Sequence, residues 1–207
     1  MDNFKFFALA YLNDWWQYDR NFVAGLYPGQ SRESRLYWLK EAATYYQVGR
    51  RFPEKQDGPE RLGKVLDLLD AVLKDVDALT QQNVDQAVYT LAEKFNEAYG
   101  NGVEISAASK FLWIRCKTPV MIYDNRAYTY LTRLGEKIDT GYTSYRAVCL
   151  KQFDQRAEVI RAACAELVTV KDFAPDDETG ESLKSSVESR WFHERVFDKF
   201  LWWNGAR

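Results

Sequence analysis

Apolar residues recur at helical spacing through most of the chain. From Leu62 to Val76 they stand three or four residues apart with Asp and Lys between them, which predicts an amphipathic helix. The same period predicts a helix from Asn83 to Ala98, with Thr80 as its N-cap and Gly100 as its stop. Further helices are expected at Phe4 to Leu26, Ser34 to Val48, Ile105 to Arg115, Asn125 to Leu134, Ser144 to Leu167 and Ser186 to Trp202. The pattern predicts an all-α protein of about eight helices.

Polar segments separate the expected helices. Arg50 to Pro59 is expected to be a loop, and so is the acidic segment Asp172 to Ser182, which contains proline and glycine. The short β-like run from Val120 to Tyr123 has no partner with which to build a sheet.

The chain has 207 residues, 46% of them hydrophobic, and shows no internal repeat. We therefore expect a single helical domain over residues 1–207.

Charge and cysteine content narrow the possible functions. The formal net charge of −2 does not by itself indicate a nucleic-acid partner, although acidic residues concentrate at Asp67 to Asp77 and Asp172 to Glu181 and leave room for a basic face elsewhere. The three cysteines form no CxxC pair, which argues against a disulfide framework and a zinc site. The chain has neither a long apolar run nor a secretory leader pattern at Met1 to Phe7. We expect a cytoplasmic protein without a membrane partner.

One stretch in the middle of the chain carries the candidate chemistry. Gly100 and Gly102 permit a tight turn with positive φ between two helices. Such a turn leaves free amides from Val103 onward, at a helix N-terminus, where phosphate can bind. Pro119 then breaks the chain, and Asp124 is expected to cap the next helix at its positive end.

The order of glycine hairpin, small-residue helix, proline-containing loop and aspartate resembles the helix-hairpin-helix superfamily of DNA glycosylases. The run from Val120 to Ala127 is similar to the motif around the essential aspartate of that family. The runs from Ser106 to Leu112 and from Phe197 to Trp202 resemble bacterial 8-oxoguanine-glycosylase-like proteins. The likeness covers about a third of the chain, with a core at about residues 80–135. It implies a compact helical glycosylase fold, DNA as the partner, and base excision in DNA repair without a cofactor.

The resemblance also implies roles for individual residues. Asp124 takes the place of the essential aspartate, whose carboxylate stabilises positive charge at C1′ of the sugar or orients a water molecule. Alignment on Asp124 puts Ser106 where bifunctional relatives carry a lysine. Lys110 lies one turn later on the same helix face, so its amine could reach the same pocket, attack C1′ and form a Schiff base. The walls of a pocket for the flipped base would include Ser106, Trp113, Tyr123 and Tyr128.

Departures from the family pattern leave alternatives open. The hairpin reads Tyr99-Gly-Asn-Gly-Val rather than Leu-Pro-Gly-Val-Gly, and Glu104 puts a negative charge beside the expected phosphate site. Asp124 could be only a helix cap, Lys110 a surface lysine, and the aromatic residues core packing. No four-cysteine array follows the motif, so no iron–sulfur cluster is expected.

The competing function is a catalytically inactive module that binds nucleic acid or protein. A third, weaker hypothesis is a purely structural helical protein.

Two basic pairs, Arg50 with Arg51 and Arg115 with Lys117, are candidate phosphate contacts. The one histidine, His193, is expected to be structural. The excised base depends on pocket shape, and no linear motif specifies it or the oligomeric state.

Overall fold

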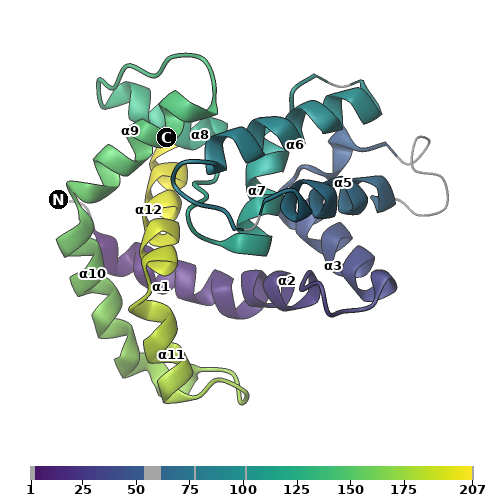
Figure 1. Ribbon diagram of the computed structural model, residues 1–207. Helices are drawn as coiled ribbons and strands as arrows, with labels where there is room; N and C mark the ends of the chain where they lie inside the picture. The colour runs from purple at the N-terminus through teal and green to yellow at the C-terminus, as the bar shows by residue number, and fades with distance from the viewer. Residues whose placement is uncertain (1–2, 54–61, 77, 101, 207) are drawn as a thin grey trace. The chain divides into compact units, whose positions relative to one another are not determined.

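The computed structural model describes residues 3–53, 62–76, 78–100 and 102–206, and these ranges contain helices and no strand. The α-helices are α1 to α3 and α5 to α12 (Figure 1). The prediction of an all-α protein is confirmed. Within the described ranges, no helix has the length and apolar character needed to cross a membrane.

Contacts between residues divide the chain into two compact units. Unit 1 comprises Met1–Gln17 and Tyr123–Arg207, and unit 2 comprises Tyr18–Ile122. The chain passes from unit 1 to unit 2 within the π-helical turn η1 (Trp15–Asp19) and returns after Ile122. The expectation of one folding domain stays a prediction, because contacts do not test how the chain folds.

Unit 2 is built from three consecutive pairs of packed helices. α5 packs on α6, α6 packs on α7, and α2 packs on α3. α7 is apolar on most of its circumference and is buried from Ala107 to Ile114, as expected of a helix without a polar face. The elements are α2 (Arg20–Gly25), α3 (Arg32–Tyr45), the 3₁₀ turn η2 (Gly49–Arg51), α5 (Gly63–Lys74), α6 (Val84–Tyr99) and α7 (Ile105–Cys116).

An aromatic cluster joins α6 to α7 in unit 2. The ring of Phe52 lies 5.0 Å from Phe95, 5.1 Å from Tyr99 and 6.1 Å from Phe111, measured between centroids. All four side chains are buried. The pairs with Phe95 and Tyr99 are edge-on, and such pairs each contribute about 0.5–1.5 kcal/mol beyond the area they bury. The cluster therefore stabilises the hairpin that carries the candidate motif.

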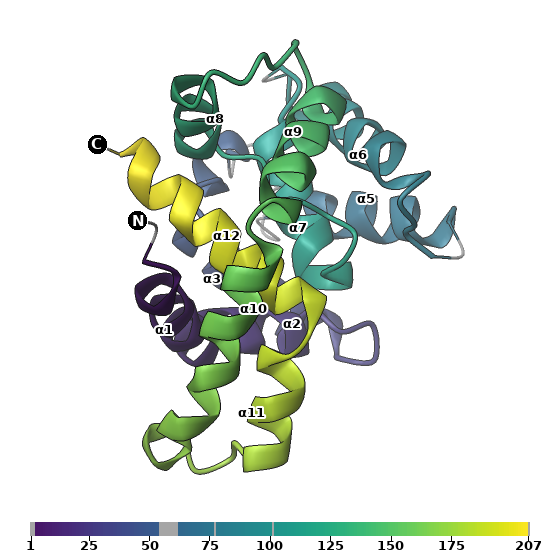
Figure 2. The ribbon, with the colours of Figure 1, turned by 90° about the vertical axis from the view of Figure 1, so that its left-hand side faces the viewer.

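Unit 1 is organised around its C-terminal helix. α12 packs along α8, α1 and α10, and Figure 2 shows α12 crossing beside α10. The rings of Phe4 and Phe7 contact Phe200, and Tyr11 contacts Phe192. The elements are α1 (Phe4–Asp14), α8 (Asn125–Arg133), α9 (Tyr142–Asp154), α10 (Ala157–Ala165), the 3₁₀ segment η3 (Glu166–Phe173), α11 (Gly180–Val187) and α12 (Arg190–Gly205).

Some expected boundaries are wrong because local turns interrupt the hydrophobic period. The stretch from Phe4 to Leu26 contains the π-helical turn η1, and the stretch from Ser144 to Leu167 breaks between α9 and α10. α11 ends at Val187, so the last expected helix begins later, at Arg190.

The loops also differ from expectation. The acidic loop is shorter than expected, since η3 extends to Phe173 and α11 starts at Gly180. α6 begins after Asn83, whereas the Thr80 hydroxyl accepts a hydrogen bond from the Gln82 amide at 3.3 Å and does not cap α6. Residues 54–59 of the expected loop from Arg50 lie outside the described residues.

Gly205, at the end of α12, allows close contact with α8. A Cβ at this position would lie 1.9 Å from the backbone carbonyl oxygen of Arg126. Because that atom belongs to the first turn of α8, the turn would have to move. We expect Gly205→Ala to lower the free energy of unfolding by about 1–3 kcal/mol, measured by urea denaturation followed by circular dichroism.

The matched control is Gly180→Ala in α11 of the same unit. An added Cβ there meets nothing within 4 Å, so this variant should be neutral or more stable by roughly 0.5 kcal/mol. Equal stability of the two variants would show that α8 accommodates the added methyl group without cost.

Candidate functional site

The α6–α7 hairpin has the backbone geometry that the sequence predicts. Gly100 ends α6 in the left-handed conformation with φ 68°, and Gly102 has φ 84°. An added Cβ would meet nothing within 4 Å at either position, so the positive φ rather than space favours glycine. Asn101, the middle residue of the predicted turn, lies outside the described residues. The prediction of two helices bounded by these glycines is confirmed.

The hairpin amide of Gly102 has a protein partner. Its N–H donates to Oδ1 of Asn96 at 2.8 Å. Val103 follows and is exposed. A phosphate bound by the Gly102 amide would have to displace the Asn96 side chain, so the phosphate-binding role of Gly100, Gly102 and Val103 stays a prediction.

Glu104 occupies the N-cap position of α7 without capping it. Its carboxylate pairs instead with Arg51, with 3.4 Å between the carboxylate oxygen and Nε. Burial raises the pKa of Glu104 above its ordinary value, and the charges of Arg51 and Arg50 act in the opposite direction. An acid at this position competes with a phosphate for the positive end of the helix.

Lys110 is buried, with 5% of its surface exposed, so the alternative of an ordinary surface lysine is wrong. The side chain runs back along α7 by one turn, and Nζ donates to Oγ of Ser106 at 3.0 Å. Long side chains on a helix point toward its N-terminus, which explains this direction. The amine therefore lies beside position 106, where the resemblance places the nucleophilic lysine.

Asp19 and Tyr46 lie in the surroundings of Lys110, and sequence reasoning missed both. Nζ of Lys110 is 5.9 Å from the ring centroid of Tyr46, whose hydroxyl donates to Oδ1 of Asp19 at 2.8 Å. The Asp19 side chain is completely buried. A signal existed: Asp19 stands four residues after Trp15 and three before Phe22, so helical spacing puts an acid on an apolar face.

Asp124 caps α8 as predicted, with Oδ1 accepting a hydrogen bond from the Arg126 amide at 2.9 Å. The Tyr123 ring lies 6.4 Å from Tyr128 and 4.7 Å from the buried Tyr145. Burial raises the pKa of Tyr123, and Tyr128 and Asp124 add to the increase. Unit 1 therefore brings Asp124 together with the two tyrosines that the sequence singled out.

Two other residues that the sequence singled out are buried in the structure. Trp113 is 1% exposed and lies in the core of unit 2. Its role in the wall of a base pocket stays a prediction. His193 is buried and Nε2 lies 2.8 Å from the carbonyl oxygen of Val187; burial lowers its pKa. Lys110, Ser106 and Trp113 belong to unit 2, and Asp124 belongs to unit 1.

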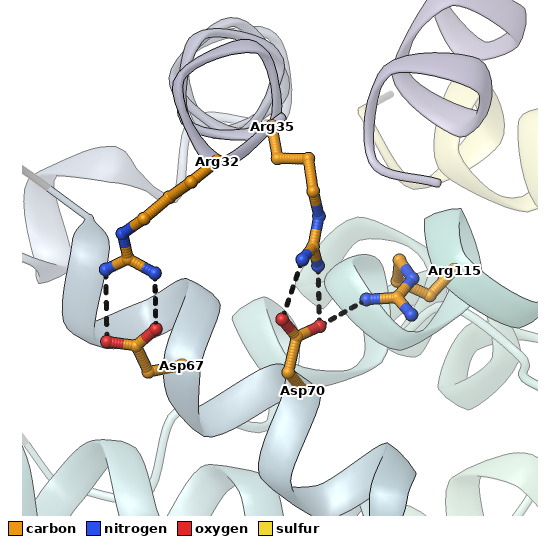
Figure 3. Close-up of polar contacts among 5 residues, drawn as sticks. All are labelled: Arg32, Arg35, Asp67, Asp70 and Arg115. Atoms are coloured by element: carbon orange, nitrogen blue, oxygen red, sulfur yellow. Dashed lines mark hydrogen bonds and ion pairs between the residues drawn. The ribbon is translucent and has the colours of Figure 1, made fainter. Parts of the chain in front are cut away.

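Arg115 is held in an ion-pair cluster and is not an exposed phosphate contact (Figure 3). It donates to Oδ1 of Asp70 at 2.6 Å. Arg35 binds the same carboxylate with both terminal nitrogens, at 2.6 and 2.8 Å. The two arginine side chains are only 10% and 9% exposed, whereas the neighbouring pair of Arg32 and Asp67 is largely in solvent.

Comparison with known protein families, curated proteins and solved structures finds no match. Within the described part of the chain, no group of three or more His, Cys, Asp or Glu is placed to hold a metal ion. The interpretation of the site therefore depends on its own residues.

The Asp70 cluster makes stability depend on acid pH. Burial acts to raise the pKa of Asp70, but the hydrogen bonds and charges of Arg35 and Arg115 outweigh it, so the pKa lies below its ordinary value. A carboxyl group whose pKa is lower in the folded than in the unfolded protein stabilises the fold at pH values above its pKa in the unfolded protein. This stabilisation is lost as the pH falls through its pKa in the folded protein. We expect the melting temperature to fall below about pH 4 in the wild type, and this acid dependence to flatten in Asp70→Asn.

The same substitution should lower stability at neutral pH. Asp70→Asn leaves two buried guanidinium groups without their carboxylate and should lower the free energy of unfolding by about 2–3 kcal/mol. The loss is smaller than for a completely buried ion pair because Asp70 is partly exposed. Asp67→Asn is the matched control on the same helix, and should cost less than about 1 kcal/mol. Urea denaturation at pH 7 measures both; equal losses would contradict the structural role of Asp70.

Proposed function

We propose that this chain is a DNA glycosylase of the helix-hairpin-helix class, which flips out a damaged or modified base and excises it in DNA repair. The observation that carries the proposal is the Lys110 amine, buried and hydrogen-bonded to Ser106 on α7, the second helix of the hairpin whose turn contains Gly100 and Gly102. Lysine is rarely buried in a protein core, and a buried amine is removed from bulk water, as a nucleophile at this position requires. The cap by Asp124 on the next helix gives further support.

Asp124 is the proposed catalytic carboxylate. As the bond between C1′ and the base nitrogen stretches, positive charge grows on the sugar, and a carboxylate stabilises it. The bonding electrons leave with the base, which takes up a proton. In the hydrolytic reaction a water oxygen bonds to C1′ and releases a proton. Tyr123 and Tyr128 would form part of the wall around the flipped nucleotide.

Lys110 is the proposed nucleophile for a second, lyase activity. Its unprotonated amine bonds to C1′ as the base departs with the electrons of the broken bond. Nζ then loses a proton. The sugar ring opens as the bond between C1′ and O4′ breaks, and O4′ takes up a proton. This gives the iminium form of the Schiff base. The ring-opened sugar can then lose its 3′ phosphate by elimination, which nicks the strand.

Two observations favour a second candidate, a binding module without catalysis. The Gly102 amide is taken by Asn96, and the carboxylate of Glu104 lies at the start of α7. Both features weaken a phosphate site at the hairpin, which an active glycosylase would use to hold its DNA. In this alternative the helices serve a nucleic-acid or protein partner without excision.

Asp124→Asn tests the proposed carboxylate. The amide can still cap α8, but it offers no negative charge to C1′, so excision should fall by at least about 100-fold with little change in melting temperature. The measurement uses duplexes and single strands that carry different lesions, followed by alkali cleavage at abasic sites. Asp139→Asn, in a segment of unit 1 outside the helices, is the control. Undiminished excision by Asp124→Asn would remove this carboxylate from the mechanism.

Lys110→Gln tests the proposed nucleophile. During turnover by the wild type, borohydride should reduce the Schiff base and leave a covalent adduct of protein and DNA, visible as a slower band on a denaturing gel. Lys110→Gln should lose this adduct, and Lys40→Gln, on the exposed side of α3, should retain it. Excision without any adduct would make the enzyme monofunctional. Absence of both on every lesion would favour the binding module.

A further inference from the structure

Asp19 is a completely buried carboxylate in unit 2. Removing a carboxylate from water is costly, so a buried one depends strongly on its hydrogen-bond donors. The Tyr46 hydroxyl supplies one such bond, at 2.8 Å. Asp19 is also the last residue of the π-helical turn η1, a rare irregularity that is frequent at functional sites.

Tyr46 connects this carboxylate to the amine of Lys110. Its ring centroid lies 5.9 Å from Nζ, within the range over which an aromatic ring attracts a cation. The rings of Tyr45 and Phe22 contact the Tyr46 ring at 5.0 and 6.4 Å and restrict its rotation. The orientation of the phenol is thus set at one end by packing and at the other by Asp19.

We propose that Asp19 and Tyr46 are positioning residues for the Lys110 amine, an inference that rests on the proposed lyase activity. Asp19 accepts a hydrogen bond from the Tyr46 hydroxyl, the Tyr46 ring centroid lies 5.9 Å from Nζ of Lys110, and Nζ donates to the Ser106 hydroxyl. The iminium nitrogen that forms after attack on C1′ is cationic, so the ring also stabilises this intermediate. Neither residue contacts the sugar in this scheme.

The first arm of the test measures the contact without any DNA. In protein labelled with [ε-¹³C]lysine, the Tyr46 ring current should displace the Lys110 Hε resonance, which Lys110→Gln identifies by its disappearance. Tyr46→Phe keeps a ring and should retain most of the displacement, whereas Tyr46→Leu should abolish it. Asp19→Ala removes the same hydrogen bond as Tyr46→Phe and should reduce the displacement to about the same extent. Tyr37→Leu, an exposed tyrosine on α3, is the matched control.

The second arm compares two steps of the reaction. Tyr46→Leu should lower the ratio of borohydride-trapped adduct to excised base by about tenfold, Tyr46→Phe should lower it less, and Tyr37→Leu should leave it unchanged. Asp19→Asn keeps an acceptor for the phenol and should lie between wild type and Tyr46→Leu. A residue that only supports the fold would lower trapping and excision together and leave the ratio unchanged.

The two arms separate this inference from the proposed function. A Lys110 resonance that is the same in Tyr46→Leu as in the wild type overturns the inference, whatever the activity. An unchanged ratio in an active Tyr46→Leu enzyme overturns it too. If no lesion is excised, the proposed function fails, and the resonance measurement decides alone whether Asp19 and Tyr46 position the amine. If Tyr46→Leu does not fold, Tyr46→Phe and Asp19→Ala carry the first arm, and Tyr46→Phe and Asp19→Asn carry the second.

Discussion

Unit 2 depends on one carboxylate, Asp70, which joins three helices. Its side chain stands on α5 and binds Arg35 from α3 and Arg115 from α7. Two guanidinium groups that are almost removed from water require this acid, since either would otherwise be a buried unpaired charge. α7 also carries Lys110, five residues before Arg115, so the ion pair that holds the end of this helix also constrains the position of the amine.

Polar side chains in unit 2 form two groups. In one, Asp19 accepts from Tyr46, and the Lys110 amine donates to Ser106 and lies 5.9 Å from the Tyr46 ring centroid. In the other, Asp70 joins its two arginines. A buried hydrogen bond is weakened when its partner moves, and a buried polar group left without its partner is costly. These contacts therefore restrict the side-chain arrangement more than hydrophobic burial alone does. The same restriction is what a reactive amine requires.

In unit 1, the position of Asp124 depends on the fit between α8 and α12. The Arg126 guanidinium lies 4.4 Å from the centroid of the Trp202 ring, and the Arg126 carbonyl approaches the backbone of Gly205. These contacts hold the first turn of α8, which Asp124 caps. The residues that hold the carboxylate thus come from the last turns of the chain, about 80 positions away in the sequence.

The amino-acid sequence alone determined the all-α class, the periodic helices α5 and α6, the glycines of the hairpin and the cap by Asp124, because each depends on neighbours within a few residues. It could not locate the π-helical turn, the break between α9 and α10, or the partners of Asp19 and Asp70, because those depend on contacts between residues distant in sequence. Tertiary structure decided that Lys110 is buried and that Arg115 is held by Asp70. Local spacing indicates which face of a helix a side chain occupies, but only packing decides what lies opposite that face.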